Sequence, residues 1–139
     1  MPSLEPDLPF EFVVWGTAIS LQGSSRSKDD WKRAIQASAR SALPEGSWLL
    51  TDNLAVTIFI FPGAIMQGDV DNRVKPIVDA MTKCVYSNDE LIERVVVQKF
   101  EPGRIFAFQN PTAVLLTALE ADEPVVYIRI TDRVHEELM

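Results

Sequence analysis

The chain has 139 residues, of which 47% are hydrophobic, and its formal net charge is −7. This length predicts one compact domain over residues 1–139, with flexible termini at residues 1–9 and 133–139. No apolar run is long enough to cross a bilayer, and the first ten residues lack the basic and apolar regions of a signal peptide. These features argue against a membrane-spanning protein and lead us to expect a soluble protein of the cytoplasm.

The content of cysteine and histidine limits the kinds of metal site. The chain has one cysteine, Cys84, and one histidine, His135. A disulfide within the chain, a cysteine-based zinc site and a His-rich metal site are therefore excluded. Any metal would be bound by oxygen ligands, which favours magnesium, manganese or calcium over zinc or copper. We interpret Cys84 as a small buried hydrophobic residue and His135 as a surface residue.

The first part of the chain predicts a strand, a polar loop and a helix. Residues 10–18 are rich in valine and aromatic side chains, whereas residues 20–28 are polar. Residues 29–43 have a helical apolar stripe, with Asp29 or Asp30 as the cap at the start and a proline directly after the end. The stripe consists of Trp31, Ile35, Ala39 and Ala42.

Further strands and helices follow along the chain. Residues 53–61, 93–100 and 124–131 are typical of strands, and residues 111–121 are typical of a helix. Together with a helix after residue 70, the pattern gives about four strands and three helices. The predicted fold class is α+β, a single compact domain in which a small mixed sheet packs against helices.

Residues 70–85 contain a helix with an apolar face and a charged row. The apolar positions, spaced for one side of a helix, are Val70, Val74, Ile77, Val78 and Met81. The charged row, at intervals of four, consists of Asp71, Lys75 and Asp79. Pro76 fits a helix best in its first turn, so we expect the regular helix to begin near Asn72 or Arg73.

Acidic residues gather just before and just after this helix. Asp69 and Asp71 lie at or before its start, and Asp89 and Glu90 follow its end. Aspartates at a helix start can simply cap its N–H groups, but two carboxylates one residue apart repel unless a cation or hydrogen-bond donors offset them. If the turn after the helix folds back, the three aspartates would form an oxygen-ligand site for Mg²⁺. An EF-hand is excluded, because valine and alanine occupy its glycine and glutamate positions.

Basic residues are concentrated in and before the first predicted helix. Residues 19–40 hold five basic residues against two acidic ones, although the whole chain is acidic. Such residues either line a solvated surface or contact the phosphates of a nucleic acid. The candidate DNA contacts are Arg26, Lys28, Lys32, Arg33 and, within the acidic segment, Arg73.

The run DVDNRVKPIVDAMTKCVYSND, residues 69–89, resembles the signature of the RusA family of Holliday-junction resolvases. The shared features are the D-x-D-N start, a lysine four residues after the second aspartate, the following D-A-hydrophobic segment and acidic residues beyond a tyrosine. Residues 12–40 resemble the family's opening strand, loop and helix, and residues 123–131 resemble its closing strand. The chain departs from the family at Asn88, where an aspartate is usual.

The resemblance implies a homodimeric endodeoxyribonuclease, dependent on Mg²⁺ or Mn²⁺, that resolves Holliday junctions or other branched DNA in recombination and repair. The implied catalytic residues are Asp69, Asp71, Lys75 and Asp89, of which the three aspartates bind the metal. Asn72 matches the family residue that follows the second aspartate and is expected to support the site. Helical spacing beside Lys75 gives Asp79 a structural or supporting role, and the side-chain carbonyl oxygen of Asn88 offers a further ligand in place of the usual aspartate. Two alternatives stay open: a catalytically weakened member that binds nucleic acid or protein without cutting, and a purely structural ion pair at Lys75.

Overall fold

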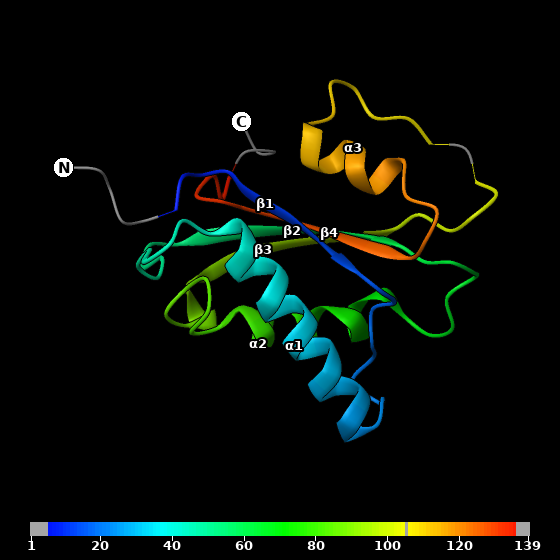
Figure 1. Cartoon of the computed structure of the whole chain (residues 1–139), viewed down its shortest axis with the longest axis horizontal. Helices are drawn as coiled ribbons and strands as arrows, with labels where there is room; N and C mark the ends of the chain where they lie inside the picture. Colours follow the sequence, from blue (N-terminus) through cyan, green and yellow to red (C-terminus); the bar gives the residue numbers. More distant parts are fainter. Residues whose placement is uncertain (1–5, 105, 136–139) are drawn as a thin grey trace.

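A four-stranded mixed sheet forms the centre of the protein in a computed structural model that describes residues 6–104 and 106–135 (Figure 1). The strands are β1 (Phe10–Trp15), β2 (Leu54–Phe61), β3 (Ile92–Lys99) and β4 (Val125–Thr131). They lie in the order β1-β4-β2-β3, with β2 and β3 parallel and the other neighbouring pairs antiparallel. The predicted α+β fold, with a small mixed sheet in a single compact domain, is confirmed. The outermost residues of both predicted flexible termini lie outside the described residues.

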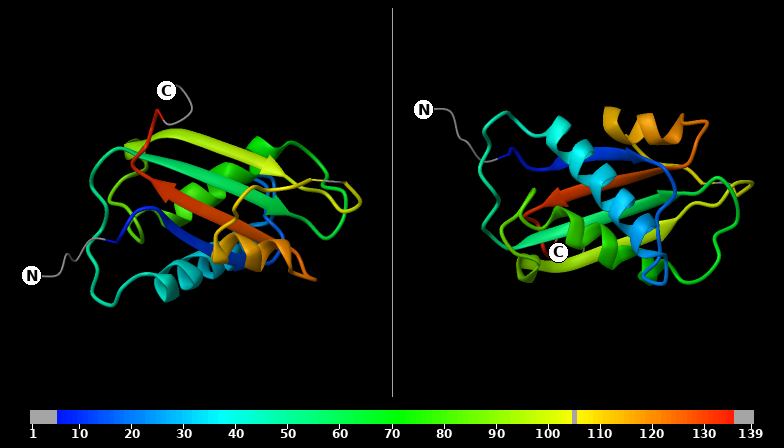
Figure 2. Two further views of the ribbon diagram at one scale, coloured as in Figure 1. Left: turned by 90° about the horizontal axis from the view of Figure 1, so that it is seen from above. Right: turned by 60° about the horizontal axis from the view of Figure 1, so that its bottom comes forward.

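Three α-helices in the described part of the chain cover the two faces of this sheet unequally. They are α1 (Ser25–Ala42), α2 (Val74–Met81) and α3 (Ala113–Leu119). Two 3-10 turns, η1 (Val70–Arg73) and η2 (Asp89–Leu91), flank α2. Figure 2 shows α1 and α2 on one face of the sheet and the shorter α3 on the other. Among the described residues, no helix is long and apolar enough to span a membrane.

The alternation of side chains along β2 explains why both faces of the sheet are covered. Val56, Ile58 and Ile60 belong to the larger core, under α1 and α2. Phe59 and Phe61 lie on the opposite side and pack around the smaller cluster under α3. The helix residues buried in the larger core are Trp31, Ile35, Ala39, Ile77, Ala80 and Met81. Truncating one of its fully buried isoleucines to alanine should cost about 2–5 kcal/mol. Most of the buried apolar residues lie on this face rather than under α3, so this face contributes most to the stability of the fold.

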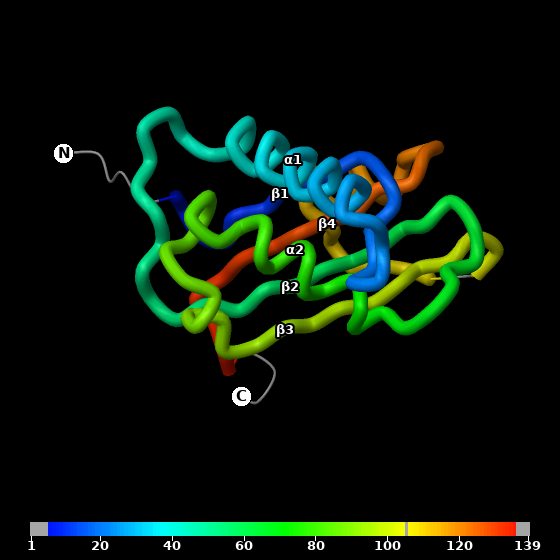
Figure 3. Tube along the Cα trace, turned by 90° about the horizontal axis from the view of Figure 1, so that it is seen from below, coloured from blue at the N-terminus to red at the C-terminus, as the bar shows by residue number. Residues whose placement is uncertain are grey.

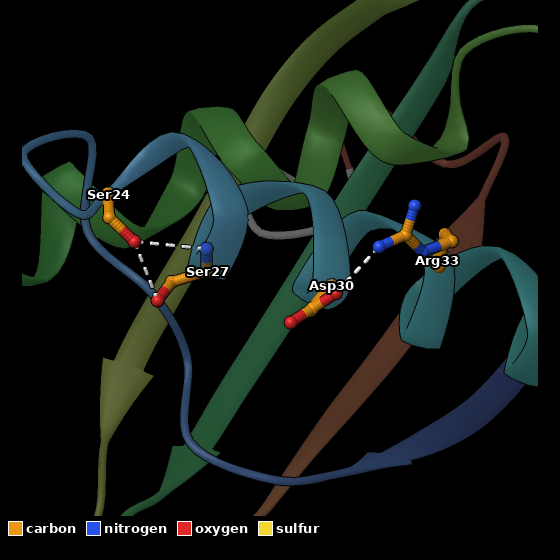
Figure 4. A network of polar contacts seen from close by, with 4 residues as sticks. All are labelled: Ser24, Ser27, Asp30 and Arg33. Carbon is orange, nitrogen blue, oxygen red and sulfur yellow. Dashed lines mark hydrogen bonds and ion pairs between the residues drawn. The ribbon is translucent and has the colours of Figure 1, made fainter.

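The start of α1 differs from the prediction. A cap at Asp29 or Asp30 is wrong, because the helix begins at Ser25 and is capped by Ser24, whose Oγ accepts the N–H of Ser27 at 3.1 Å (Figure 4). The first turn holds no apolar residue, so the periodicity that marks the later turns gives no signal there. The basic residues predicted for the polar loop therefore lie in the first turns of a helix.

Other element ends follow the sequence with small differences. Leu43 ends α1, with its N–H bonded to the carbonyl of Ala39, and a proline follows as predicted. Of the predicted apolar stripe only Ala42, the last helical residue, is exposed. The first strand is shorter than predicted because Gly16 has φ +131°, and a Cβ there would lie 3.3 Å from the ring of Trp31. Backbone and packing together thus turn the chain out of the sheet at this glycine.

Candidate active site

The acidic segment enters α2 through a tight turn. η1 covers Val70–Arg73, and α2 begins at Val74, close to the predicted start. Pro76 is the third residue of α2, where its missing N–H costs no helical hydrogen bond, as predicted. Ile77 is fully buried, but Val70 is only half-buried and lies outside the main core, because it belongs to the turn rather than to the regular helix. The turn presents the residues around Val70 to solvent.

Asp69 and Asp71 are both exposed in this turn. Asp69 occupies the cap position of η1 with an extended backbone, yet its carboxylate makes no capping hydrogen bond in the described part of the chain. Asp71 contributes its backbone carbonyl to the N–H of Val74. The alternative that Asp69 is present to cap the helix therefore does not fit the structure, and its carboxylate faces water.

Arg73 forms hydrogen bonds to two loops beside this turn, the loop after β1 and the loop after β2. Its Nη1 donates to the carbonyl of Ala18 at 2.8 Å and its Nη2 to the carbonyl of Gln67 at 2.5 Å. Its Nε is buried without a hydrogen-bond partner among the described residues. Both terminal nitrogens of Arg73 thus donate to backbone carbonyls of the protein. The sequence did not indicate this structural role. Its contact with DNA stays a prediction.

The loop before α1 lies directly beside the acidic segment. The N–H of Leu21 donates to the carbonyl of Asn72 at 3.0 Å, and Lys28 Nζ donates to the carbonyl of Leu21 at 3.2 Å. Figure 3 shows the start of α1 next to the start of α2. Asn72 is therefore joined through its backbone to the loop that leads into α1, whereas the sequence predicted only that it supports the aspartates. The acidic turn and the start of α1, which carries Arg26 and Lys28, thus lie at the same end of the two helices.

The predicted basic residues are not equivalent. Arg26 and Lys32 are exposed, and Lys28 is half-buried against the loop. Arg33 Nη2 contacts Asp30 Oδ1 at 2.6 Å, as Figure 4 shows, with both side chains largely exposed. An exposed pair of this kind contributes little stability, about 0–1 kcal/mol, and exchanges easily. Arg33 is therefore the member of this set whose charge is already balanced within α1.

Lys75 lies one helical turn beyond Asp71 and pairs with Asp79. The Lys75 Nζ to Asp79 Oδ2 distance is 3.2 Å, and both side chains are about half exposed or more. The predicted ion pair on the Asp79 side is confirmed. It should contribute only about 0.3–0.5 kcal/mol, so the pair leaves Lys75 available for another anion.

The turn after α2 is fixed by Tyr86. This side chain is fully buried, and its hydroxyl donates to the carbonyl of Val78 at 2.6 Å. The pKa of Tyr86 is raised above its ordinary value, first by burial and then by the negative charges of Asp89 and Asp79. The buried Tyr86 thus ties the turn after α2 to that helix, while convergence of Asp89 with Asp69 and Asp71 stays a prediction.

Asn88 precedes η2 and caps it. Its side-chain oxygen accepts the N–H of Glu90 at 2.9 Å, while the side chains of Asp89 and Glu90 are exposed. An asparagine is among the best residues for this position. Because aspartate would cap the turn equally well, the cap does not explain the departure from the family pattern at Asn88, and a supporting role toward a metal stays a prediction.

The three predicted metal ligands lie on both sides of α2. In the chain, Asp69 and Asp71 precede the helix and Asp89 follows it. Within residues 6–104 and 106–135, no group of three or more Asp, Glu, His or Cys side chains is placed to hold a metal ion. Metal binding by these aspartates stays a prediction.

Comparison with known families decides the class of the protein. The model of the family described as endodeoxyribonuclease RusA matches residues 23–107. The chain belongs to the RusA family. The match includes α1, β2, α2, β3 and all four predicted catalytic residues of this RusA protein, while β1, α3 and β4 lie outside it. Membership indicates endodeoxyribonuclease activity. No curated protein matches the chain.

Glu101 is a residue near the site that the sequence analysis missed. It follows β3 and is only 3% exposed, yet it is an acid. Its Oε2 accepts the N–H of Met66 at 2.8 Å and lies 3.3 Å from Lys99 Nζ, and its Oε1 lies 3.4 Å from Arg104 Nη2. The Met66 N–H lowers the pKa of Glu101 most, with help from Lys99 and Arg104, while burial opposes them. The only sequence signal was a glutamate between two basic residues at a strand end.

Proposed function

We propose that this RusA protein is a metal-dependent, structure-specific endodeoxyribonuclease. It cuts Holliday junctions or other branched DNA by phosphodiester hydrolysis, in DNA recombination and repair. The observation that carries the proposal is the backbone contact from Leu21, in the loop that leads into α1, to Asn72 in the acidic turn. Cutting a nucleic acid needs metal-binding and phosphate-binding groups near each other, and this contact places the acidic turn next to the loop before the basic first turns of α1.

The residues of the acidic turn fit a hard divalent cation. Mg²⁺ prefers oxygen ligands and is usually held by one or two carboxylates, with waters and substrate phosphates completing its shell. Asp69 and Asp71 supply such a pair, exposed and with no capping bond at Asp69. Asp89, from the turn after α2, would be the third ligand once the metal is bound. When bound, Mg²⁺ or Mn²⁺ would polarise the scissile phosphate and lower the pKa of an attacking water.

The positive groups of the chain would hold the DNA backbone. The first turn of α1 carries the positive end of the helix dipole together with Arg26 and Lys28, a favourable place for a phosphate. Lys75, on the α2 turn after Asp71, would offset negative charge that develops on the scissile phosphate. Breaking its exposed pair with Asp79 costs little, so Lys75 can change partner when DNA arrives.

A homodimer suits both the sheet and the substrate. In the described sheet, β1 and β3 are edge strands with unpaired backbone groups on one side, which offers places for a second copy to add. A four-way junction has two-fold symmetry, so a two-fold dimer would present one site to each of two opposing strands. Light scattering coupled to gel filtration tests this directly, and a monomer at cleavage concentrations would contradict it.

The test of the proposed function is cleavage of a mobile four-way junction compared with a linear duplex. Wild type and Asp71→Asn are each assayed with Mg²⁺, Mn²⁺ or EDTA. We expect symmetric, metal-dependent nicks in the junction from wild type alone. Junction binding without cleavage by a folded wild type under every metal would instead favour the catalytically weakened binding protein. Equal cutting of both substrates would remove the structure specificity from the proposal.

A further inference from the structure

Resting on the proposed function, we propose that Glu101 is a positioning residue for the acidic pair. It neither touches DNA nor binds the metal itself. Its buried carboxylate holds the backbone of the loop that leads from β2 to η1, and so fixes where Asp69 and Asp71 present their oxygens. Loss of this contact should weaken metal binding in a protein that still folds.

The contact joins two loops that are far apart in sequence. Met66 and Glu101 are separated by 35 residues, and the hydrogen bond between them is 2.8 Å long. In Figure 3 the loop after β2 and the loop after β3 run alongside each other at the same end of the sheet. The bond therefore ties the loop before the acidic pair to the firmly paired end of β3.

Asp69 follows Met66 by only three positions. A fully extended stretch of that length reaches about 10 Å, so a loop released at Met66 could move Asp69 by several ångströms. Gly68, with φ +81°, gives this short stretch a backbone state that other residues rarely adopt. Metal sites need their ligands held within about 0.5 Å. A firm anchor close to Asp69 is therefore required, and Glu101 supplies it from outside the segment.

Arg73 holds the other side of the same loop. Its Nη2 bonds the carbonyl of Gln67, the residue after Met66. The buried Glu101 thus accepts the N–H of Met66, and the half-buried Arg73 donates to the carbonyl of Gln67, which together fix the orientation of the peptide units between them. Two charged side chains of opposite sign thus bind the backbone at two adjacent residues, Met66 and Gln67. This double attachment indicates that the position of this loop matters.

The charge of Glu101 matters to the strength of the anchor. Hydrogen bonds to an ionised carboxylate are roughly twice as strong as neutral ones. A buried carboxylate would be costly if it were alone, but Lys99 and Arg104 offset it here. Glu101→Gln keeps an acceptor oxygen and the shape of the side chain while removing the charge, whereas Glu101→Ala removes the anchor altogether. Glu120→Gln, at the exposed end of α3, is the matched control.

The first experiment is calorimetric titration of each protein with Mn²⁺ in the absence of DNA, with thermal unfolding measured in parallel. We expect Kd for Mn²⁺ to rise about tenfold in Glu101→Gln and more in Glu101→Ala, and to stay unchanged in Glu120→Gln. In cleavage assays, KM for the junction should stay constant while kcat falls at low Mg²⁺ and recovers at high Mg²⁺. If Glu101→Ala does not fold, Glu101→Gln alone carries the test.

The outcomes separate this proposal from the proposed function. If wild type binds Mn²⁺ and cuts junctions, but Glu101→Gln matches it in Kd and in metal requirement, Glu101 is structural and the inference is overturned. A lower melting temperature with unchanged Kd has the same meaning. If wild type neither binds Mn²⁺ nor cuts, the proposed function itself fails. Shifted amide resonances of residues 66–71 in Glu101→Gln, measured without metal, would support the positioning role independently.

Discussion

Two acidic sites near one loop of this protein differ in almost every physical respect. Asp69 and Asp71 are exposed, and Asp69 makes no capping bond although it occupies a cap position. Glu101 is 3% exposed and has three positively polarised partners within 3.4 Å. A capping bond at Asp69 would contribute about 0.5–2 kcal/mol. The comparison teaches that the exposed pair is arranged for something other than stability, whereas the carboxylate of Glu101 is fully engaged in contacts within the protein.

The largest expected effect is on activity, at the exposed pair. Asp71→Asn removes one of the negative charges that would hold the metal, so we expect junction cleavage to fall by about 10³-fold or more. The free energy of unfolding should change by less than about 0.5 kcal/mol, because the side chain is exposed. Rate assays and denaturant unfolding measure the two quantities, with Asp122→Asn as an exposed control. If Asp71→Asn instead lost its activity because the protein unfolded, Asp71 would be a stabilising residue and would no longer contrast with Glu101.

A smaller effect is expected at Lys75. Lys75→Met should lower kcat on the order of 10²-fold, because the ammonium group would no longer offset charge on the phosphate. Asp79→Asn breaks the same ion pair but keeps the lysine, so it should retain most of the activity. Both changes should alter the free energy of unfolding by less than about 0.5 kcal/mol. Equal losses of kcat in the two variants would instead assign the effect to the ion pair.

Glu101 should differ from the exposed pair in how stability depends on pH. The folded state lowers the pKa of Glu101, so its ionised form stabilises the protein above the unfolded-state pKa of about 4.3. That contribution is lost as the pH falls through the lowered folded-state pKa. We expect the melting temperature of wild type to exceed that of Glu101→Gln at pH 7, and the difference to shrink below about pH 5. A difference that grows on acidification would contradict this assignment.

The smallest effects on stability and on metal requirement are expected at Asn88, which is exposed like the aspartates but makes a capping hydrogen bond. Asn88→Asp can keep the cap of η2, so its stability should match wild type, and its Mg²⁺ requirement should change only a few-fold. Asn88→Ala loses the cap and should cost about 1 kcal/mol. Denaturant unfolding and Mg²⁺ titration of cleavage measure these changes. A gain of tenfold or more in metal affinity from Asn88→Asp would show that this position belongs to the metal site.

The sequence by itself determined the fold class and most of the element positions. Periodicity placed α2 and Ile77 at the core, because helix burial repeats at a fixed spacing, and it located three strands to within about two residues. The D-x-D-N motif and its lysine gave the family. The start of α1 was missed, since its first turn is polar and only the hydroxyl of Ser24 marks it.

Only the tertiary structure decided how the site is held. The bonds of Arg73 to the carbonyl of Ala18 and of Glu101 to the N–H of Met66 join residues 55 and 35 positions apart. Neither the spacing nor the composition of a chain encodes such a contact, because a carbonyl or an N–H exists at nearly every residue. The chemistry of the carboxylates can be predicted from the sequence. The position of the backbone that carries them depends on contacts between loops that are distant in sequence.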